Sequence, residues 1–244
     1  MSNDSFIDIH CHILPGVDDG SRDMNSSLQM ARVAVKNQIG EIIVTPHYTS
    51  AHRSVSADGV RGRVQELQAV CHAEKLDLKF YPGNELLYDS SLPDKLSQGE
   101  VLTLADSKYC LIEFFPMDNF QYIQEGLRAV RYAGFRPILA HCERYVCMVE
   151  HPDYAERLVD QEVLLQCNSA SVLPKLFQPL PKFVKGLLSK GLVSFIATDA
   201  HRPEGNRAPD ILRTATWLRK KYGETSSGAL LYGNARRIIQ GDTL

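Results

Sequence analysis

Short runs of apolar and β-branched residues alternate along the chain with longer segments of helical periodicity. Runs of about four to eight such residues, bounded by polar or turn residues, are typical of buried strands. Their alternation with helical segments indicates βα units built around a parallel sheet. Seven runs fit this description and are predicted to be strands: residues 6–10, 41–45, 78–83, 109–114, 136–140, 163–167 and 193–198.

The segments between these strands repeat apolar residues at the spacing of a helix face. In the first segment, Leu28, Ala31 and Val35 share one face, and either Ser21 or Asp23 is the candidate N-cap. The remaining predicted helices cover residues 60–75, 91–98, 120–133, 152–161, 180–190, 209–222 and 228–240.

The whole chain, residues 1–244, is predicted to form a single α/β domain. The loops at 49–59 and 171–181 are polar or proline-rich, but neither resembles a linker between domains. Seven consecutive βα units favour a barrel of the TIM type with one strand fewer than usual. In βα barrels the functional site lies at the carboxyl ends of the strands, so the residues that follow each strand are the candidates.

The composition narrows the classes of partner. With 44% hydrophobic and 23% charged residues, the chain has the make-up of an ordinary globular protein. Its net charge of -2 argues against broad electrostatic binding of nucleic acid. The N-terminal residues lack a basic start and an apolar signal core, so we expect a cytoplasmic protein without membrane insertion. The six cysteines are scattered, which indicates reduced thiols.

Histidines and acids follow six of the seven predicted strands. Five of the eight histidines fall at these positions, and only the sixth strand lacks an evident ligand, offering Asn168 instead. A single histidine of this kind is most often an ordinary loop residue, but so many at one end of a barrel indicate a metal centre. The candidate ligands are His10, His12, either Asp18 or Asp19, His47, Glu85, Glu113, His141, Asp199 and His201.

The spacing and the charges of these residues suit metal binding. Side chains two apart on a strand point to the same face, as His10 and His12 do. Imidazole and carboxylate ligands without thiolate suit Mn, Fe or Zn. Two divalent ions would only neutralise four carboxylates, whereas three would leave positive charge for a phosphate ester dianion. Asp8 shares the face of His10 and is expected to support the structure or to accept a hydrogen bond from the ring nitrogen of a ligand histidine.

Other polar residues receive ordinary interpretations. His72 falls in a predicted helix, and His52 and His151 fall in polar loops. The stretch HCERYVCM at 141–148 begins like the phosphate loop of cysteine-dependent tyrosine phosphatases, but the position that must be arginine is Met148. We therefore expect no catalytic cysteine. Cys11, between two candidate ligands, should point away from the metal centre.

Six motifs resemble one family in order along nearly the whole chain: DIHCHILPGVDDG, TPHY, PGNE, IEF, AHCERY and TDAH. They are similar to the PHP (polymerase and histidinol phosphatase) metal-dependent phosphoesterases, and most of all to the bacterial capsule and exopolysaccharide tyrosine phosphatases of the CpsB/YwqE type. The resemblance implies a distorted (β/α)7 barrel and three divalent ions, most often assigned as Mn²⁺. It also implies a phosphotyrosine-bearing substrate, a bacterial tyrosine kinase of polysaccharide export.

The resemblance also assigns roles to individual residues. It selects Asp19 over Asp18 as a ligand and makes Glu85 the carboxylate that bridges metals. Arg144 becomes one phosphate-binding arginine, and Arg207 fits best as the second, with Arg202 as a rival. Guanidinium groups suit this role because they can bind phosphate oxygens in pairs. The implied chemistry is hydrolysis by a metal-activated hydroxide.

Three other functions are compatible with parts of this pattern. Within the same family, the chain could hydrolyse histidinol phosphate or another small phosphomonoester. A TatD-like deoxyribonuclease or an amidohydrolase also begins with His-x-His. A nuclease of that type would leave Asp19, His47 and His201 without a role. Against an amidohydrolase, strand four offers Glu113 and no bridging lysine. The third is a metal-dependent regulatory module without catalysis.

Overall fold

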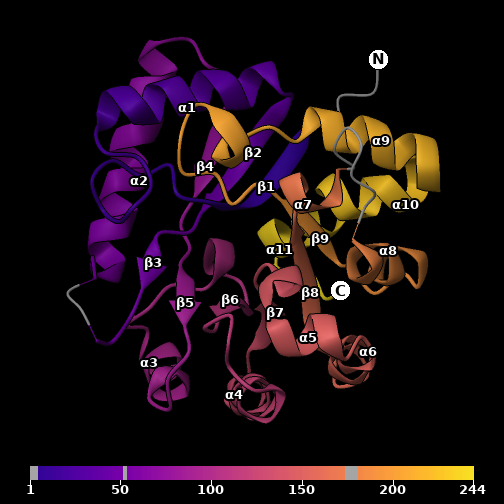
Figure 1. The fold of residues 1–244 in the computed structure, drawn as a ribbon. Coiled ribbons are helices and arrows are strands. Elements are labelled where there is room, and N and C mark those ends of the chain that lie inside the picture. Colours follow the sequence, from indigo (N-terminus) through magenta and orange to yellow (C-terminus); the bar gives the residue numbers. More distant parts are fainter. Residues whose placement is uncertain (1–4, 52–53, 174–180) are drawn as a thin grey trace.

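The computed structural model describes residues 5–51, 54–173 and 181–244 of the chain. Nine parallel strands lie in the middle of the molecule, and helices surround them (Figure 1). The strands are β1 (Phe6–Cys11), β2 (Ile39–Val44), β3 (His47–Tyr48), β4 (Lys79–Tyr81), β5 (Glu85–Leu87), β6 (Tyr109–Glu113), β7 (Arg136–Leu139), β8 (Leu164–Asn168) and β9 (Phe195–Ala197).

Eleven α-helices lie in the described part of the chain. The first begins after Asp23, whose side chain accepts a hydrogen bond from Ser26 N at 2.8 Å and is therefore the N-cap. The helices are α1 (Met24–Lys36), α2 (Ala57–Ala73), α3 (Leu92–Gln98), α4 (Phe120–Tyr132), α5 (Val146–Glu150), α6 (Asp153–Val159), α7 (Ser169–Val172), α8 (Lys182–Ser189), α9 (Leu212–Tyr222), α10 (Glu224–Gly228) and α11 (Asn234–Gln240).

All seven predicted strands are present, as β1, β2, β4, β6, β7, β8 and β9, but the short strands β3 and β5 were not predicted. Each of these two follows a proline, Pro46 or Pro82, that separates it from the strand before it. Proline lacks the N–H group that a continuous ladder needs. The sheet is therefore divided into the orders β1-β2-β4 and β3-β5-β6-β7-β8-β9.

The parallel sheet curls so that its first and last strands meet. Cys11 of β1 forms an isolated parallel bridge with Ala200, just after β9. His12 N donates to Ala200 O and Asp199 N donates to His10 O, both at 2.8 Å. These bonds join β1 and β9 at their carboxyl ends, where the candidate ligands lie.

Two hydrophobic clusters hold the sheet and the helices together. The larger one lies mostly between the strands and the helices and includes Cys11, Met30 and Leu127. The smaller one collects residues from β1, β2, β6, β7 and β9 together with α11. Strands from both sheet segments thus share one buried cluster, as expected of a curled sheet.

The helix predictions need one correction at the C-terminus. Residues 228–240 were expected to form a single helix, but a π-helical segment, Ala229–Gly233, precedes α11. The short helices α5, α7 and α10 were not predicted, because four or five residues show too little periodicity. His52 lies outside the described residues, as does most of the predicted loop 171–181.

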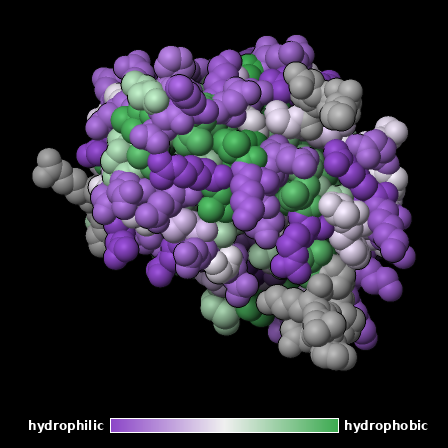
Figure 2. Space-filling view, turned by 90° about the horizontal axis from the view of Figure 1, so that it is seen from above, coloured by the Kyte–Doolittle hydropathy of each residue, from purple (hydrophilic) through white to green (hydrophobic). Residues whose placement is uncertain are grey.

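Figure 2 shows one face of the molecule, on which hydrophilic side chains predominate and separate smaller hydrophobic areas. Among the described residues, no helix combines the length and the apolar character needed to cross a membrane.

Candidate metal centre

The nine candidate ligands meet at the carboxyl ends of the strands. Overlapping groups of three or four of them bring their ligand atoms within 4.8 Å of one another. His10, His12, His47 and Glu85 each belong to two groups, so the groups form one connected centre. Its members are His10, His12, Asp19, His47, Glu85, Glu113, His141, Asp199 and His201.

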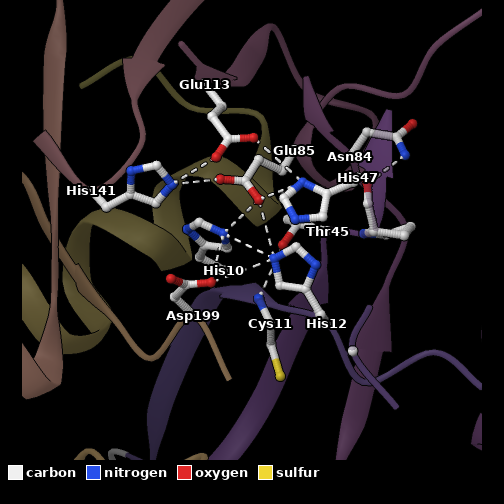
Figure 3. A network of polar contacts seen from close by, with 12 residues as sticks. His10, Cys11, His12, Thr45, His47, Asn84, Glu85, Glu113, His141 and Asp199 are labelled. Carbon is white, nitrogen blue, oxygen red and sulfur yellow. Dashed lines mark hydrogen bonds and ion pairs between the residues drawn. The ribbon is translucent and has the colours of Figure 1, made fainter. Parts of the chain in front are cut away.

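Glu85 occupies the middle of this centre (Figure 3). Its Oε2 lies 3.1 Å from the Nε2 atoms of His10 and His12 and from Nδ1 of His47. Its Oε1 lies 2.9 Å from Nε2 of His141. Burial alone would raise the pKa of Glu85, but the charge of His10 and hydrogen bonds from the surrounding imidazoles hold it well below its ordinary value. Glu85 is therefore a carboxylate shared by four rings.

The rings of His10 and His12 are held by acceptors on their outer nitrogens. His10 Nδ1 donates to Gln166 Oε1 at 3.1 Å, and His12 Nδ1 donates to Asp18 Oδ2 at 2.8 Å. Both Nε2 atoms then point inward, 3.2 Å apart and toward Glu85. If each ring carries its proton on Nδ1, the lone pairs of the two Nε2 atoms face each other and the carboxylate of Glu85. Such an arrangement is stable only with a positive charge between these groups.

A proton on His12 can supply such a charge, and a divalent cation can supply more. Although burial lowers it, hydrogen bonds to Asp18 and Glu85 raise the pKa of His12 to about 10. In addition, Glu85 Oε2 is buried without a hydrogen-bond partner of good geometry. Inward-pointing imidazole nitrogens around buried carboxylate oxygens fit the donor set that Mn, Fe and Zn accept.

The two aspartates of the first loop have different positions. Asp18 accepts from His12 Nδ1, from Gly20 N at 2.9 Å and from His47 N at 3.1 Å. Asp19 is 64% exposed, and its Oδ1 lies 3.5 Å from His47 Nε2 and 3.3 Å from His201 Nε2. Asp18 therefore orients the surrounding groups, whereas Asp19 is placed among the candidate ligands.

Gly20 allows the loop to return close to β1. A Cβ atom at this position would lie 2.2 Å from His12 O and 2.5 Å from His12 Cβ. No side chain fits there without moving the backbone of a candidate ligand. The Asp-Gly turn thus brings both aspartates back to the centre.

Glu113 and His141 complete the centre on the side of β6 and β7. His141 Nε2 lies 3.4 Å from Glu113 Oε1, and His47 Nδ1 lies 3.4 Å from Glu113 Oε2. Burial alone would lower the pKa of His141, but hydrogen bonds to Glu113 and Glu85 raise this pKa to about 10. Glu113 is 22% exposed and His47 34%, so this side of the centre is open to solvent.

Strand β8 contributes two side-chain amides, of Gln166 and Asn168. Of these, the sequence pattern drew attention only to Asn168. Gln166 Oε1 accepts from His10 Nδ1 and, at 2.7 Å, from His141 N. Its Nε2 donates to Asn168 Oδ1 at 2.8 Å, and Asn168 Nδ2 donates to Asp199 Oδ2 at 2.8 Å. The alternation of Gln166 and Asn168 on a strand was the available signal, since it matches the spacing of His10 and His12.

Two candidate ligands have unusual backbone conformations. His141 has φ of 29° and Asp199 has φ of 52°, a region that residues other than glycine rarely adopt. Each lies two residues after the last residue of a strand, Leu139 of β7 or Ala197 of β9. Such conformations persist where the surroundings enforce them, often at functional sites. Here each residue turns its side chain toward the centre where its strand ends.

His201 and Asp199 lie together at the end of β9. His201 Nδ1 donates to Asp199 O at 3.0 Å, which leaves Nε2 as an acceptor. Burial and the nearby charge of His12 lower the pKa of His201 to about 4. His201 is therefore neutral near pH 7, the state in which an imidazole binds metal.

Arg144 and Arg207 both reach the centre. Arg144 lies 2.7 Å from Asp199 Oδ2. An Nη atom of Arg207 lies 2.6 Å from His201 Nε2 and 3.3 Å from Asp199 Oδ1. Arg202 instead lines a neighbouring cavity beside Asp19. The contacts therefore favour Arg207 over Arg202 as the second arginine of the centre.

Of the two roles expected of Asp8, the structure shows the structural one. Asp8 accepts from Thr198 N at 3.0 Å and from the backbone N of His10, and it bonds no ring nitrogen. Its role is to tie β1 to β9, and the ring acceptors are Gln166 and Asp18 instead.

The cysteines take no part in the centre. Cys11 points away from it in Figure 3, as expected. Burial raises the pKa of the Cys11 thiol well above its ordinary value, and a hydrogen bond with Cys142 together with burial does the same for Cys167. High thiol pKa values disfavour the thiolate that a nucleophile needs.

Comparisons with known proteins identify the family of this chain. A family model described as "Capsular polysaccharide synthesis, CpsB/CapC" matches residues 6–240. The tyrosine-protein phosphatase YwqE of Bacillus subtilis (strain 168) is 35% identical, over 98% of this chain and 93% of that protein. The tyrosine-protein phosphatase CpsB of Streptococcus pneumoniae is 29% identical, over 96% of this chain and 98% of that protein.

Solved structures extend the comparison to three dimensions. A crystal structure from work on YwqE and CpsB, described as unique metal-dependent tyrosine phosphatases, superposes with a TM-score of 0.88. It is 31% identical and covers 98% of this chain and 96% of that one. A variant organophosphorus hydrolase from Deinococcus radiodurans, 13% identical with a TM-score of 0.56, shares the fold alone over 96% of this chain and 93% of that one. By the extent of the sequence and structural matches, the chain belongs to the CpsB/CapC family.

Proposed function

We propose that this protein is a metal-dependent tyrosine-protein phosphatase, a phosphomonoesterase of capsule or exopolysaccharide synthesis. One observation carries the proposal: the inward Nε2 atoms of His10 and His12 lie 3.2 Å apart and face the buried carboxylate of Glu85. The substrate is a phosphotyrosine-bearing protein, a bacterial tyrosine kinase of polysaccharide export. The names of the relatives YwqE and CpsB support this reaction.

Three divalent ions, Mn²⁺ in the native protein with Fe or Zn as alternatives, complete the centre. When bound, they supply Lewis-acid polarisation of the phosphate and activation of water near neutral pH. The four ligand carboxylates neutralise most of the charge of three divalent ions. The surplus of about two positive charges suits a phosphate ester dianion. The residues that hold the ions are His10, His12, Asp19, His47, Glu85, Glu113, His141, Asp199 and His201.

The two arginines bind the phosphate. Arg144 and Arg207 are 42% and 39% exposed, so solvent and substrate reach both guanidinium groups. Both contact Asp199, which places their positive charges on one side of the centre. Their N–H groups can donate to the non-bridging phosphate oxygens and stabilise charge that develops there.

We also propose that the curled sheet is a distorted (β/α)7 barrel. The isolated bridge between Cys11 and Ala200, which joins the carboxyl ends of β1 and β9, supports this architecture. Residues 1–244 form one domain. The protein acts in the cytoplasm on this kinase substrate.

Metal content and turnover measured together test the function. The protein purified with Mn²⁺ should hydrolyse a phosphotyrosine peptide, and Glu85→Gln should lose both bound metal and turnover because the shared carboxylate loses its charge. Glu41→Gln is a matched control, since Glu41 lies on β2 and bonds Tyr81 at 2.7 Å, away from the centre.

Three results would contradict the proposal. Turnover that survives complete metal removal would exclude the metal mechanism. A strong preference for histidinol phosphate over the peptide would instead assign the chain to small phosphomonoesters. Bound metal without turnover on either substrate would indicate a regulatory module.

A further inference from the structure

Exposed apolar side chains gather beside the proposed metal centre. Six large hydrophobic residues are well exposed in the described part of the chain. Four of them lie at the carboxyl end of the sheet, on the loop after β6 and on helix α5. These four residues, the apolar platform, have exposed fractions of 61, 79, 37 and 47%: Phe115, Met117, Val146 and Val149. Single exposed apolar residues are ordinary, but clusters mark interaction surfaces.

The two segments of the platform are joined and closely follow residues of the centre. Phe115 comes two residues after Glu113, and Val146 comes two residues after Arg144. Val146 N donates to Pro116 O at 3.0 Å, so the loop after β6 and the start of α5 lie side by side. The platform is therefore continuous with the rim of the centre.

A cavity of about 740 Å³ extends from the same rim. Arg144 and Val149 both line it, so it connects the proposed phosphate site to the platform. Ligand sites commonly measure about 300–1,000 Å³, so this cavity has room beyond a single phosphate group. Its other lining is mainly apolar and includes Pro152, Leu173, Phe183 and Val184.

We propose that the platform and this cavity bind the polypeptide on either side of the substrate's phosphotyrosine, with a preference for apolar flanking residues. The inference rests on the proposed phosphatase function and adds a basis for selecting protein substrates. A phosphotyrosine that reaches the centre brings its own chain against the rim, where Phe115, Met117 and Val149 present apolar surface. A small phosphate ester has no chain to make these contacts.

The test compares two phosphotyrosine peptides and p-nitrophenyl phosphate. One peptide has leucine and valine on both sides of the phosphotyrosine, and the other has serine there. Phe115→Ser/Met117→Ser and Val149→Ser remove the apolar side chains of the platform without adding charge near Arg144. Tyr132→Ser is the matched control, because Tyr132 is 79% exposed but ends α4, near the amino end of β7. Anisotropy of the labelled apolar peptide measures binding apart from turnover.

Wild-type protein should prefer the apolar peptide, and the platform variants should lose on the order of tenfold in kcat/KM and in affinity for it. Turnover of p-nitrophenyl phosphate should stay unchanged in these variants, and Tyr132→Ser should behave like the wild type. An unchanged preference, or an equal loss on peptide and p-nitrophenyl phosphate, would overturn the proposal.

Two further outcomes separate this proposal from others. If sedimentation shows that the platform variants only dissociate a dimer, with peptide kinetics unchanged, the platform binds a second copy of the chain and the proposal is wrong. If the wild type turns over no phosphotyrosine substrate yet binds the apolar peptide through the platform, the phosphatase function fails while the docking surface stands.

Discussion

Replacing Gln166 with leucine tests whether the ligand-free strand β8 orients the metal centre. Leucine is close to glutamine in volume but forms no hydrogen bond. The change removes the acceptor of His10 Nδ1 at 3.1 Å and of His141 N at 2.7 Å, and the donor to Asn168 Oδ1 at 2.8 Å. All of these groups are buried, so water does not replace the lost partner.

Two quantities should fall, for separate reasons. Three hydrogen bonds at about 1 kcal/mol each predict that the free energy of unfolding drops by about 3 kcal/mol. Loss of the group that holds a metal-binding histidine typically lowers metal affinity by about 10–100-fold. Isothermal titration of the metal-free protein with Mn²⁺ measures the affinity, and urea unfolding measures the stability.

Two variants make the result interpretable. Gln68→Leu removes a glutamine that bonds Leu78 O at 2.9 Å and Phe80 N at 3.0 Å, far from the centre. It should lower stability by about 2 kcal/mol without changing Mn²⁺ affinity. Gln166→Glu keeps the acceptor oxygens and should recover part of the affinity. Wild-type affinity in Gln166→Leu, or an equal loss in Gln68→Leu, would refute the reasoning.

Three other predictions follow from the same centre. Asp18→Ala should weaken Mn²⁺ binding by about tenfold in calorimetry, because His12 loses the acceptor that orients its ring. Gly20→Ala should sharply reduce the metal retained after gel filtration, since the new Cβ would displace the backbone of His12. A variant in which all six cysteines are replaced should keep its phosphatase turnover. Chelation of the metal should abolish turnover and added Mn²⁺ should restore it, so activity without metal would contradict this prediction.

The strands and the ligand candidates could be predicted because both are marked by patterns within short stretches of the sequence. Apolar runs mark the strands, and in parallel βα units the carboxyl ends of all strands lie at one edge. His10, His12 and His141 therefore meet although 129 residues separate the last two in the sequence. No knowledge of side-chain orientation was needed for that step.

The interruptions of the sheet could not be predicted in the same way. Pro46 and Pro82 are visible in the sequence, but whether a proline ends a strand or only bends it depends on the neighbouring strand. In the structure, His47 N bonds Asp18 instead of a strand, and His47 then pairs with Glu85 across β3 and β5. Contacts between distant segments decide that outcome.

The amides of β8 show why the sequence reveals ligands more readily than their orientation. His10 needs an acceptor for its outer nitrogen, whereas Asp199 needs a donor for its outer oxygen. Gln166 accepts from the first and donates to Asn168, which donates to the second. A carboxylate on this strand would add charge and could not donate, and an ammonium group could not accept. Neutral amides at alternate positions serve both needs, so a strand without ligands still determines the geometry of the centre.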